Sequence, residues 1–212
     1  MSDTGYGDFE FERKFVCAGL PQIVAAEADP VLIVQAYLLA DEGYAVRVRV
    51  QGPGAGLHPA DLDGTEEVLD ELAPRVEFAA LTAKGPHVGG TRYEAERELD
   101  PGVAVELVRR GRHHVVKLRH SVWLGDDGWV IDEFAGANAP LVVAECERGG
   151  PVVDLVVPDF CVTEVTEDPR FGNEHLAVEP YGTWRAAFER ELAVTGPAFS
   201  QEFGRNRLPS QG

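Results

Sequence analysis

The stretch FEFERKF, residues 9–15, alternates apolar and charged side chains almost throughout. Successive side chains of a β-strand point to opposite faces, so Glu10, Glu12 and Lys14 share one face if the stretch is extended. Arg13 is the one charged residue on the other, apolar face. The stretch therefore predicts a strand with a fully charged side. That side either faces water or lines a charged interior.

Four later segments repeat this pattern of charges two residues apart. They are AVRVRV (45–50), TRYEAEREL (91–99), VVKLRH (115–120) and VVAECER (142–148). An amphipathic strand with a solvated face is the simplest explanation for any one of them. Five together are harder to explain in that way, because like charges on one face repel unless an opposite charge or an ion compensates. The segments together favour a shared, charged interior.

Period-2 alternation recurs along most of the chain, so strands are expected to dominate a single domain of 212 residues. Beyond residues 9–16, strands are expected at 32–39, 44–51, 76–83, 91–99, 113–124, 129–134 and 141–148. Helices are expected at 20–26, 101–110 and 183–194, and between Thr65 as an N-cap and Pro74 as a stop.

The net charge of −17 argues against nucleic acid and anionic membranes as partners, since binding to a phosphate backbone needs a basic patch. The charged faces themselves are balanced. Their basic residues are Lys14, Arg47, Arg49, Lys84, Arg92, Lys117 and Arg119, and their acidic residues are Glu10, Glu12, Glu94, Glu96, Asp132, Glu145 and Glu147. With a pair of divalent cations the interior gains about +4, close to what a triphosphate of roughly −4 to −5 needs. A small polyanion therefore remains a suitable ligand.

The three cysteines, Cys17, Cys146 and Cys161, are odd in number and lack CxxC spacing. They favour a reducing compartment over a disulfide framework or a zinc site, so a cytoplasmic protein is expected. No apolar run approaches the length of a membrane span, and the acidic first residues, MSDTGYGDFE, do not resemble a secretory signal.

Eight elements, in order, resemble the CYTH superfamily, the triphosphate tunnel metalloenzymes, and above all its bacterial inorganic triphosphatase branch. They are E-x-E-x-K (10–14), QAYL (35–38), RVR (47–49), TAKG (82–85), RYEAE (92–96), KLR (117–119), WVIDEF (129–134) and AECE (144–147). The segment EVTEDPRFGNEHL (164–176) is also similar to this branch.

The resemblance implies an α+β, mainly β fold: an eight-stranded antiparallel β-barrel tunnel with helices packed on the outside. Its charged strand faces would then be internal, and its apolar faces would lie under helices. The expected domain spans residues 9–195, with 1–8 a disordered N-terminus and 196–212 a C-terminal tail. Residues from about 52 to 75 look like a helix-bearing insertion.

The resemblance also implies roles for the charged residues. The expected phosphate-binding residues are Lys14, Arg47, Arg49, Lys84, Arg92, Lys117 and Arg119. The expected ligands of Mg²⁺ or Mn²⁺, as a pair of ions, are Glu10, Glu12, Asp132, Glu145 and Glu147. Glu94, Glu96, Asp132 and Lys84 are the expected catalytic residues, which assist a second ion or orient the attacking water.

The function that follows is metal-dependent hydrolysis of a short linear triphosphate, first of all inorganic tripolyphosphate. Alternatives are a hydrolase of an organic triphosphate such as thiamine or nucleoside triphosphate, a class IV adenylyl cyclase, and a non-catalytic module that binds polyphosphate or nucleotide. The full set of carboxylates argues against the non-catalytic module, because a pure binder of polyanions needs only the bases. The expected partner is a small-molecule triphosphate, and a homodimer is left open.

Overall fold

The computed structural model describes residues 9–27, 29–86, 88 and 91–200. The strands are β1 (Phe9–Cys17), β2 (Val31–Asp41), β3 (Tyr44–Pro53), β4 (Phe78–Lys84), β5 (Thr91–Glu98), β6 (His113–Leu124), β7 (Asp127–Phe134), β8 (Val142–Arg148) and β9 (Cys161–Glu164). The α-helices are α1 (Gln22–Glu27), α2 (Thr65–Leu72), α3 (Pro101–Arg110), α4 (Asn173–Val178) and α5 (Tyr181–Thr195). The expected disorder of residues 1–8 and most of the expected tail, from residue 201, lie outside the described residues.

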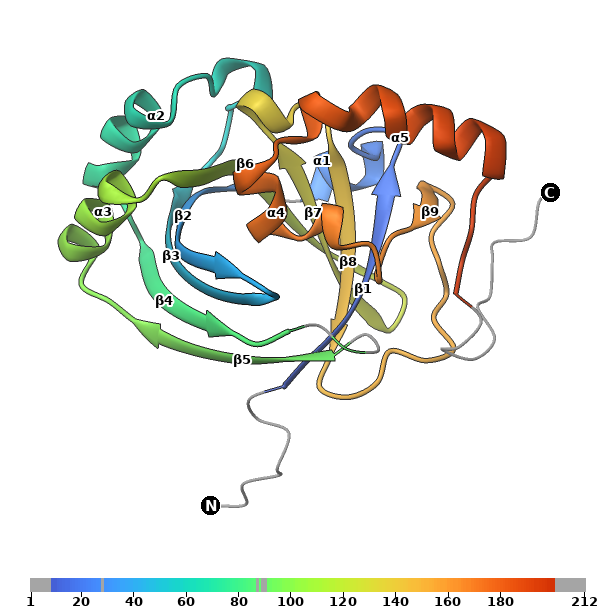
Figure 1. Cartoon of the computed structure of the whole chain (residues 1–212). Coiled ribbons are helices and arrows are strands. Elements are labelled where there is room, and N and C mark those ends of the chain that lie inside the picture. Colours follow the sequence, from blue (N-terminus) through green and yellow to red (C-terminus); the bar gives the residue numbers. More distant parts are fainter. Residues whose placement is uncertain (1–8, 28, 87, 89–90, 201–212) are drawn as a thin grey trace.

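The first eight strands form a closed antiparallel barrel, as predicted (Figure 1). Around the barrel the order is β5-β4-β3-β2-β6-β7-β8-β1, and β1 then pairs with β5 to complete the ring. This last pairing is short and joins residues 9–11 to residues 91–93. At its other end β1 pairs instead with β9, so one strand both closes the barrel and ties down the C-terminal part of the chain.

The hairpin of β2 and β3 brings two predicted arginines to the barrel interior. In its register Gln35 lies opposite Arg49 and Tyr37 lies opposite Arg47. The turn between the strands contains Gly43 with φ of +84°, a backbone conformation that residues other than glycine rarely adopt. The glycine at position 43 therefore allows this tight turn.

Helices α2 and α3 cover the outer faces of β2 and β3. Leu69 and Leu72 of α2 and Val108 of α3 are fully buried against the apolar side of these strands. The expectation that Thr65 caps α2 is wrong. The N-cap is Gly64, and its φ of +85° turns the chain into the helix without a side-chain hydrogen bond.

Helix α4, which was not predicted, fills one end of the barrel (Figure 1). Its Leu176 is fully buried in a cluster with inward-facing side chains such as Val115 and Val143. One end of the interior is therefore apolar and packed. The charged residues occupy the remainder, so the predicted tunnel is covered at this end.

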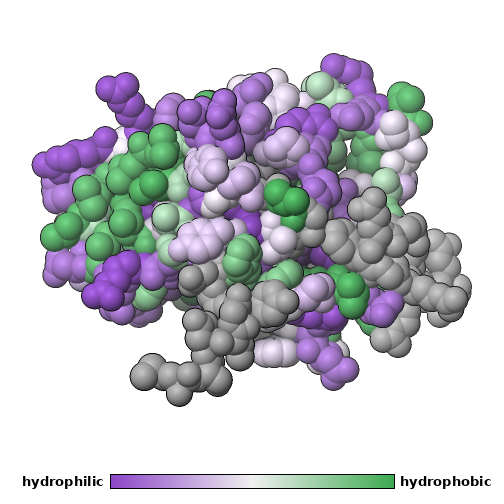
Figure 2. All heavy atoms as spheres, turned by 60° about the horizontal axis from the view of Figure 1, so that its bottom comes forward, coloured by the Kyte–Doolittle hydropathy of each residue, from purple (hydrophilic) through white to green (hydrophobic). Residues whose placement is uncertain are grey.

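Figure 2 shows hydrophilic side chains over much of one face, with hydrophobic side chains gathered on the side where α2 and α3 pack. Within the described part of the chain, none of the helices combines the length and apolar character that crossing a membrane requires.

Candidate active site

The barrel encloses a cavity of about 300 Å³ whose walls are mostly charged. Six of its lining residues are basic: Lys14, Arg47, Arg49, Lys84, Arg92 and Arg119. Its acidic lining residues are Glu10, Glu12, Glu94, Glu96, Glu145, Glu147 and Glu174. The structure thus brings twelve of the fourteen predicted residues to one cavity, on strands far apart in the sequence.

Lys117 and Asp132 differ from the other predicted residues because they lie beneath this lining. Each side chain is only 1% exposed, and Lys117 Nζ is 2.6 Å from Asp132 Oδ2. The guanidinium of Arg119 binds both oxygens of Asp132, each at 2.7 Å. Asp132 is therefore occupied by two protein cations, which is not the position expected of an open metal ligand.

These contacts change the ionisation of the buried pair. Burial alone would raise the pKa of Asp132, but Arg119 and Lys117 outweigh it and lower that pKa. Burial, together with the nearby Arg119, lowers the pKa of Lys117 to about 8 despite the attraction of Asp132. Lys117 also donates to Asn173 Oδ1 at 3.1 Å, so α4 helps to hold it.

Four carboxylates gather where β1 meets β8. Glu12 and Glu147 are directly opposite each other in the strand register. Burial raises the pKa of Glu147 to about 7, and the negative charges of Glu10, Glu12 and Glu145 add to this effect. Such crowding of like charges is stable only if a cation compensates it.

The ammonium group of Lys14 supplies part of that compensation. It forms ion pairs with Glu12 and, at 3.5 Å, with Glu145. Burial alone would lower the pKa of Lys14, but Glu12 and Glu145 outweigh it and raise that pKa. In this geometry no group of three or more His, Cys, Asp or Glu side chains among the described residues is arranged to hold a metal ion.

The donor chemistry nevertheless fits a hard divalent cation. Mg²⁺ and Mn²⁺ prefer carboxylate oxygens, and these four groups on adjacent strands supply them without competing sulfur or imidazole. Because burial and the neighbouring carboxylates raise its pKa to about 7, Glu147 holds a proton part of the time near neutral pH, and the protein's own cations leave part of the local negative charge uncompensated. A cation there would replace this proton and relieve the repulsion.

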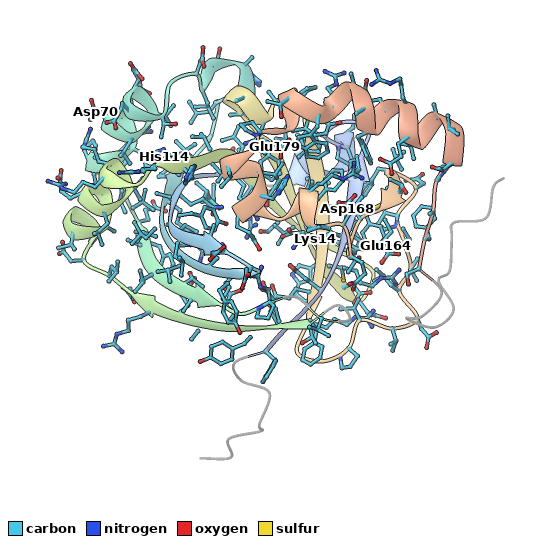
Figure 3. The ribbon with its side chains drawn as sticks, viewed as in Figure 1. Lys14, Asp70, His114, Glu164, Asp168 and Glu179 are labelled. Atoms are coloured by element: carbon cyan, nitrogen blue, oxygen red, sulfur yellow. The ribbon has the colours of Figure 1, made fainter. Side chains whose placement is uncertain are left out.

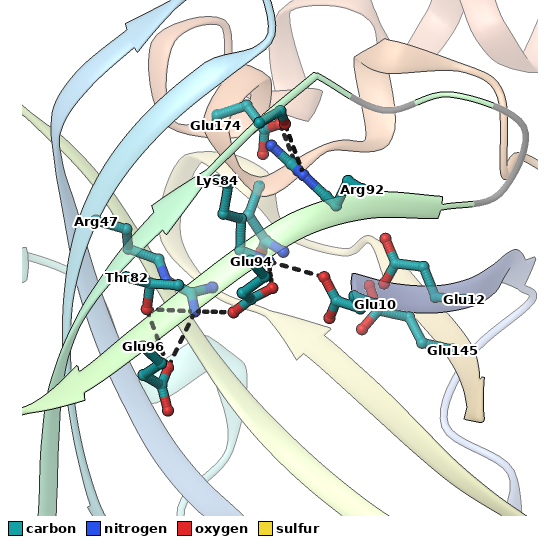
Figure 4. Close-up of polar contacts among 12 residues, drawn as sticks. Glu10, Glu12, Arg47, Thr82, Lys84, Arg92, Glu94, Glu96, Glu145 and Glu174 are labelled. Atoms are coloured by element: carbon teal, nitrogen blue, oxygen red, sulfur yellow. Dashed lines mark hydrogen bonds and ion pairs between the residues drawn. The ribbon is translucent and has the colours of Figure 1, made fainter. Parts of the chain in front are cut away.

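Further along the cavity, acids and bases alternate (Figure 4). Lys84 Nζ lies between Glu10, at 3.2 Å, and Glu94, at 2.5 Å. Burial would raise the pKa of Glu94, but its hydrogen bonding with Glu10 and the charge of Lys84 lower it. Lys84 therefore joins the carboxylates of β1 to those of β5.

Arg92 occupies the end of the cavity nearest α4. Its Nη1 is 2.9 Å from Glu174, while Nε and Nη2 donate to the carbonyl oxygens of Gly85 and Gly43. Protein acceptors thus engage all three nitrogens, whereas Nε of Arg47 and Nε of Arg49 have no hydrogen-bond partner among the described residues. The latter two arginines are better placed to receive a ligand.

Sequence reasoning missed four residues at this site: Tyr37, Thr82, Asn173 and Glu174. Tyr37, Asn173 and Glu174 line the cavity, and Thr82 binds two of its lining residues. A signal existed for Asn173 and Glu174, because the family-like segment EVTEDPRFGNEHL contains both. Tyr37 and Thr82 also lie in family-like elements, QAYL and TAKG, but their uncharged side chains did not mark them as site residues.

Comparison with known proteins agrees with this geometry. The curated inorganic triphosphatase of Acetivibrio thermocellus is 30% identical over 178 residues, which cover 83% of this chain and 97% of that protein. The crystal structure of the inorganic triphosphatase NE1496 is 26% identical with a TM-score of 0.53, covering 80% of this chain and 95% of that chain. A second crystal structure, of the hypothetical protein NE1496, has a TM-score of 0.51 at the same identity, covering 80% and 98%.

No family model matches the chain. The family is shown instead by a likeness that runs through nearly the whole length of a curated relative. This chain belongs to the inorganic triphosphatases of the CYTH superfamily, the triphosphate tunnel metalloenzymes.

Proposed function

We propose that the protein is a divalent-metal-dependent triphosphatase that hydrolyses a short linear triphosphate, foremost inorganic tripolyphosphate, inside the barrel. Hydrolysis releases one orthophosphate and leaves a diphosphate. The observation that carries the proposal is the barrel cavity, whose walls carry both basic and carboxylate side chains. A triphosphate offers the oxygens that these bases need, and a cation offers the charge that the carboxylates need.

The basic residues bind the substrate. Arg47 and Arg49 line the cavity, and the buried Nε of each has no acceptor among the described residues, so a phosphate oxygen that reaches it would satisfy this donor. Lys14, Lys84 and Arg119 add positive charge around the same cavity. Arg92, which protein acceptors hold in place, contributes positive charge. Lys117 contributes positive charge from beneath the cavity lining.

The metal set is Glu10, Glu12, Glu145 and Glu147. When bound, Mg²⁺ or Mn²⁺ supplies neutralisation of charge on the phosphoryl oxygens and on the leaving diphosphate. If these carboxylates held a cation, Lys14 would lose its ion pair with Glu12, and a phosphate oxygen would be a suitable new partner for its ammonium. Asp132, which we expected among the ligands, instead positions Lys117 and Arg119.

Phosphoryl transfer needs little covalent assistance, so positioning and electrostatic stabilisation provide most of the rate enhancement. The residues of this chain hold the three phosphates in a charged, partly buried cavity and restrict the approach of water. Glu94 and Glu96 are the acceptors on β5 that can orient the attacking water. Their negative charge is balanced by Lys84 and by Arg47 and Arg49.

The cavity favours an inorganic substrate over an organic one. Its walls are polar and charged, and the aromatic side chains lining it are Phe9 and Tyr37 among the described residues. Phe9 is 46% exposed and packs edge-on against Tyr93. The cavity thus offers little surface on which a nucleobase or a thiazolium ring could stack.

The test is phosphate release from tripolyphosphate, ATP and thiamine triphosphate, each with Mg²⁺, with Mn²⁺ and with EDTA. We expect tripolyphosphate to give the highest kcat/KM, and chelation to abolish turnover. Faster release from ATP or thiamine triphosphate would reassign the substrate. Tight binding without turnover of all three would refute hydrolysis, and pyrophosphate release from ATP would indicate a cyclase.

The cellular setting forms part of the proposal. The three thiols are free and buried, which is consistent with a reducing cytoplasm. The partner is a small anion held inside the barrel rather than nucleic acid or a membrane surface.

A further inference from the structure

Thr82 lies in a row of four residues that crosses the barrel wall from β2 to β5. Tyr37 is opposite Arg47, and Arg47 is opposite Thr82. Thr82 is in turn opposite Glu96. Its side chain is fully buried between a predicted phosphate-binding arginine and a predicted catalytic glutamate.

The hydroxyl of Thr82 links these two charged groups (Figure 4). Arg47 Nη2 donates to Thr82 Oγ1 at 3.0 Å, and the hydroxyl donates to Glu96 Oε2 at 2.9 Å. The direct separation from Arg47 Nη2 to Glu96 Oε2 is 3.7 Å, too long for a hydrogen bond. Because a guanidinium only donates and a carboxylate only accepts, a hydroxyl between them satisfies both.

We infer that Thr82 is a positioning residue for triphosphate hydrolysis, an inference that rests on the proposed function. Its hydroxyl holds Nη2 of Arg47 against the wall, so that the buried Nε, which has no partner among the described residues, is left for a phosphate oxygen. The same hydroxyl fixes the Glu96 carboxylate, which also accepts from Arg49 at 3.1 and 3.2 Å. Thr82 thereby sets the arginine and the glutamate relative to each other.

Loss of the hydroxyl changes the balance around Arg47. Its Nη2 already lies 3.5 Å from Glu94 and 3.7 Å from Glu96. Without Thr82 as an acceptor, this nitrogen closes on the two carboxylates and turns the guanidinium out of its position in the cavity wall. The arginine then neutralises protein acids instead of the substrate.

The experiment compares Thr82→Val, which keeps the shape of the side chain, with Thr82→Ser, which keeps the hydroxyl. We expect Thr82→Val to lower kcat/KM for tripolyphosphate by about 10- to 100-fold, the usual effect of a lost hydrogen bond to a charged group. KM should rise because Arg47 contacts phosphate in the ground state, and kcat should fall because Glu96 is no longer held where it orients the attacking water. The kcat/KM of Thr82→Ser for tripolyphosphate should stay within about threefold of the wild-type value.

Thr163→Val is the matched control. Thr163 is also a buried strand threonine, with 5% exposure on β9. Its hydroxyl donates to the carbonyl of Ala198 and accepts from the amide of Ala198, both at 3.1 Å, outside the cavity lining. Both valine variants should melt at a lower temperature, but only Thr82→Val should lose kcat/KM.

Two kinetic results overturn the inference. One is a folded Thr82→Val enzyme with wild-type kcat/KM, and the other is a Thr82→Ser enzyme whose kcat/KM falls as far as that of Thr82→Val. A crystal structure of Thr82→Val gives a readout independent of turnover. Rotation of the Arg47 guanidinium toward Glu94 and Glu96 supports the inference, and an unmoved guanidinium contradicts it. If the wild-type protein hydrolyses no triphosphate, the proposed function fails separately and this structure still decides the role of Thr82.

Discussion

Arg13 and Glu164 form a buried two-point ion pair on the outer side of β1. Arg13 Nη2 is 2.6 Å from Glu164 Oε2, and Arg13 Nε is 2.9 Å from Oε1. The exposed fractions of the two side chains are 0% and 4%. Lys14, the next residue, points to the other side, and Figure 3 places Lys14 and Glu164 on either side of β1. The charge that interrupts the apolar face of FEFERKF is therefore a link to β9.

Removal of one member of this pair should destabilise the protein strongly. Arg13→Met leaves Glu164 buried without its cation, which typically costs about 3–5 kcal/mol in the free energy of unfolding. Equilibrium urea unfolding measures this change. The control, Arg185→Met, breaks an exposed pair with Glu189 and should change stability little. Similar small effects of both variants would contradict a structural role for the buried pair.

Glu12→Gln should abolish metal-dependent phosphate release while the protein stays folded. The substitution keeps the size of the side chain but removes the charge that the proposed metal ligand supplies. We expect a loss greater than the about 10- to 100-fold that follows removal of an outer partner of a metal site. Turnover with Mg²⁺ and circular dichroism measure the two effects. Glu133→Gln is the control. Glu133 contacts His120 and does not line the cavity, so this variant should retain activity. Full activity of Glu12→Gln would refute the proposed metal set.

Metal affinity should rise with pH around neutrality. Burial and neighbouring carboxylates raise the pKa of Glu147 to about 7, so this group is largely protonated below that pH. A divalent cation binds the ionised form and must displace the proton, which weakens binding as the pH falls through 7. Titration calorimetry in buffers of different ionisation enthalpy measures the released proton. The pH dependence should disappear in Glu147→Gln; its persistence there would assign it to another group.

Leu69→Ala should show that the segment of residues 52–75 is part of the folded domain. Leu69 is fully buried between α2 and the barrel wall, so its truncation should cost about 2–5 kcal/mol. Thermal and urea unfolding provide the measurement, and kcat/KM should be unchanged because the residue lies outside the barrel. Glu71→Ala, on the exposed side of the same helix, is the control. A cost below about 1 kcal/mol for Leu69→Ala would show that α2 is only loosely attached.

Where the local signals are strong, the sequence predicts the elements well. Helix α3 begins and ends at the predicted residues, because Asp100 accepts from the amide of Val103 and Pro101 starts the first turn. Strand β6 also matches its predicted bounds. Helix α4 and strand β9 were missed, since they have six and four residues and their burial depends on contacts with distant strands.

The sequence predicts only part of the site, because local patterns do not report contacts between distant strands. Alternation along a strand tells which side of the sheet a residue occupies, but not how deep in the barrel it lies. Lys117 and Asp132 are therefore on the predicted side yet sealed beneath the lining. The roles of Thr82 and Glu174 depend on neighbours from other elements, Arg47 and Arg92, which no local pattern reveals.

Strand β1 opens the described chain, yet its partners β8 and β9 come near the end of it. Arg13 and Glu164 are 151 residues apart, so almost the whole domain must leave the ribosome before β1 can be paired on both sides. Such distant contacts slow folding, because the entropy of closing a long loop is lost before the contacts form. The strand that carries Glu10 and Glu12 is thus synthesised before the other strands of the barrel, but it is paired on both sides only after β8 and β9 have been made. Newly made protein should acquire its ability to bind metal only when the barrel closes.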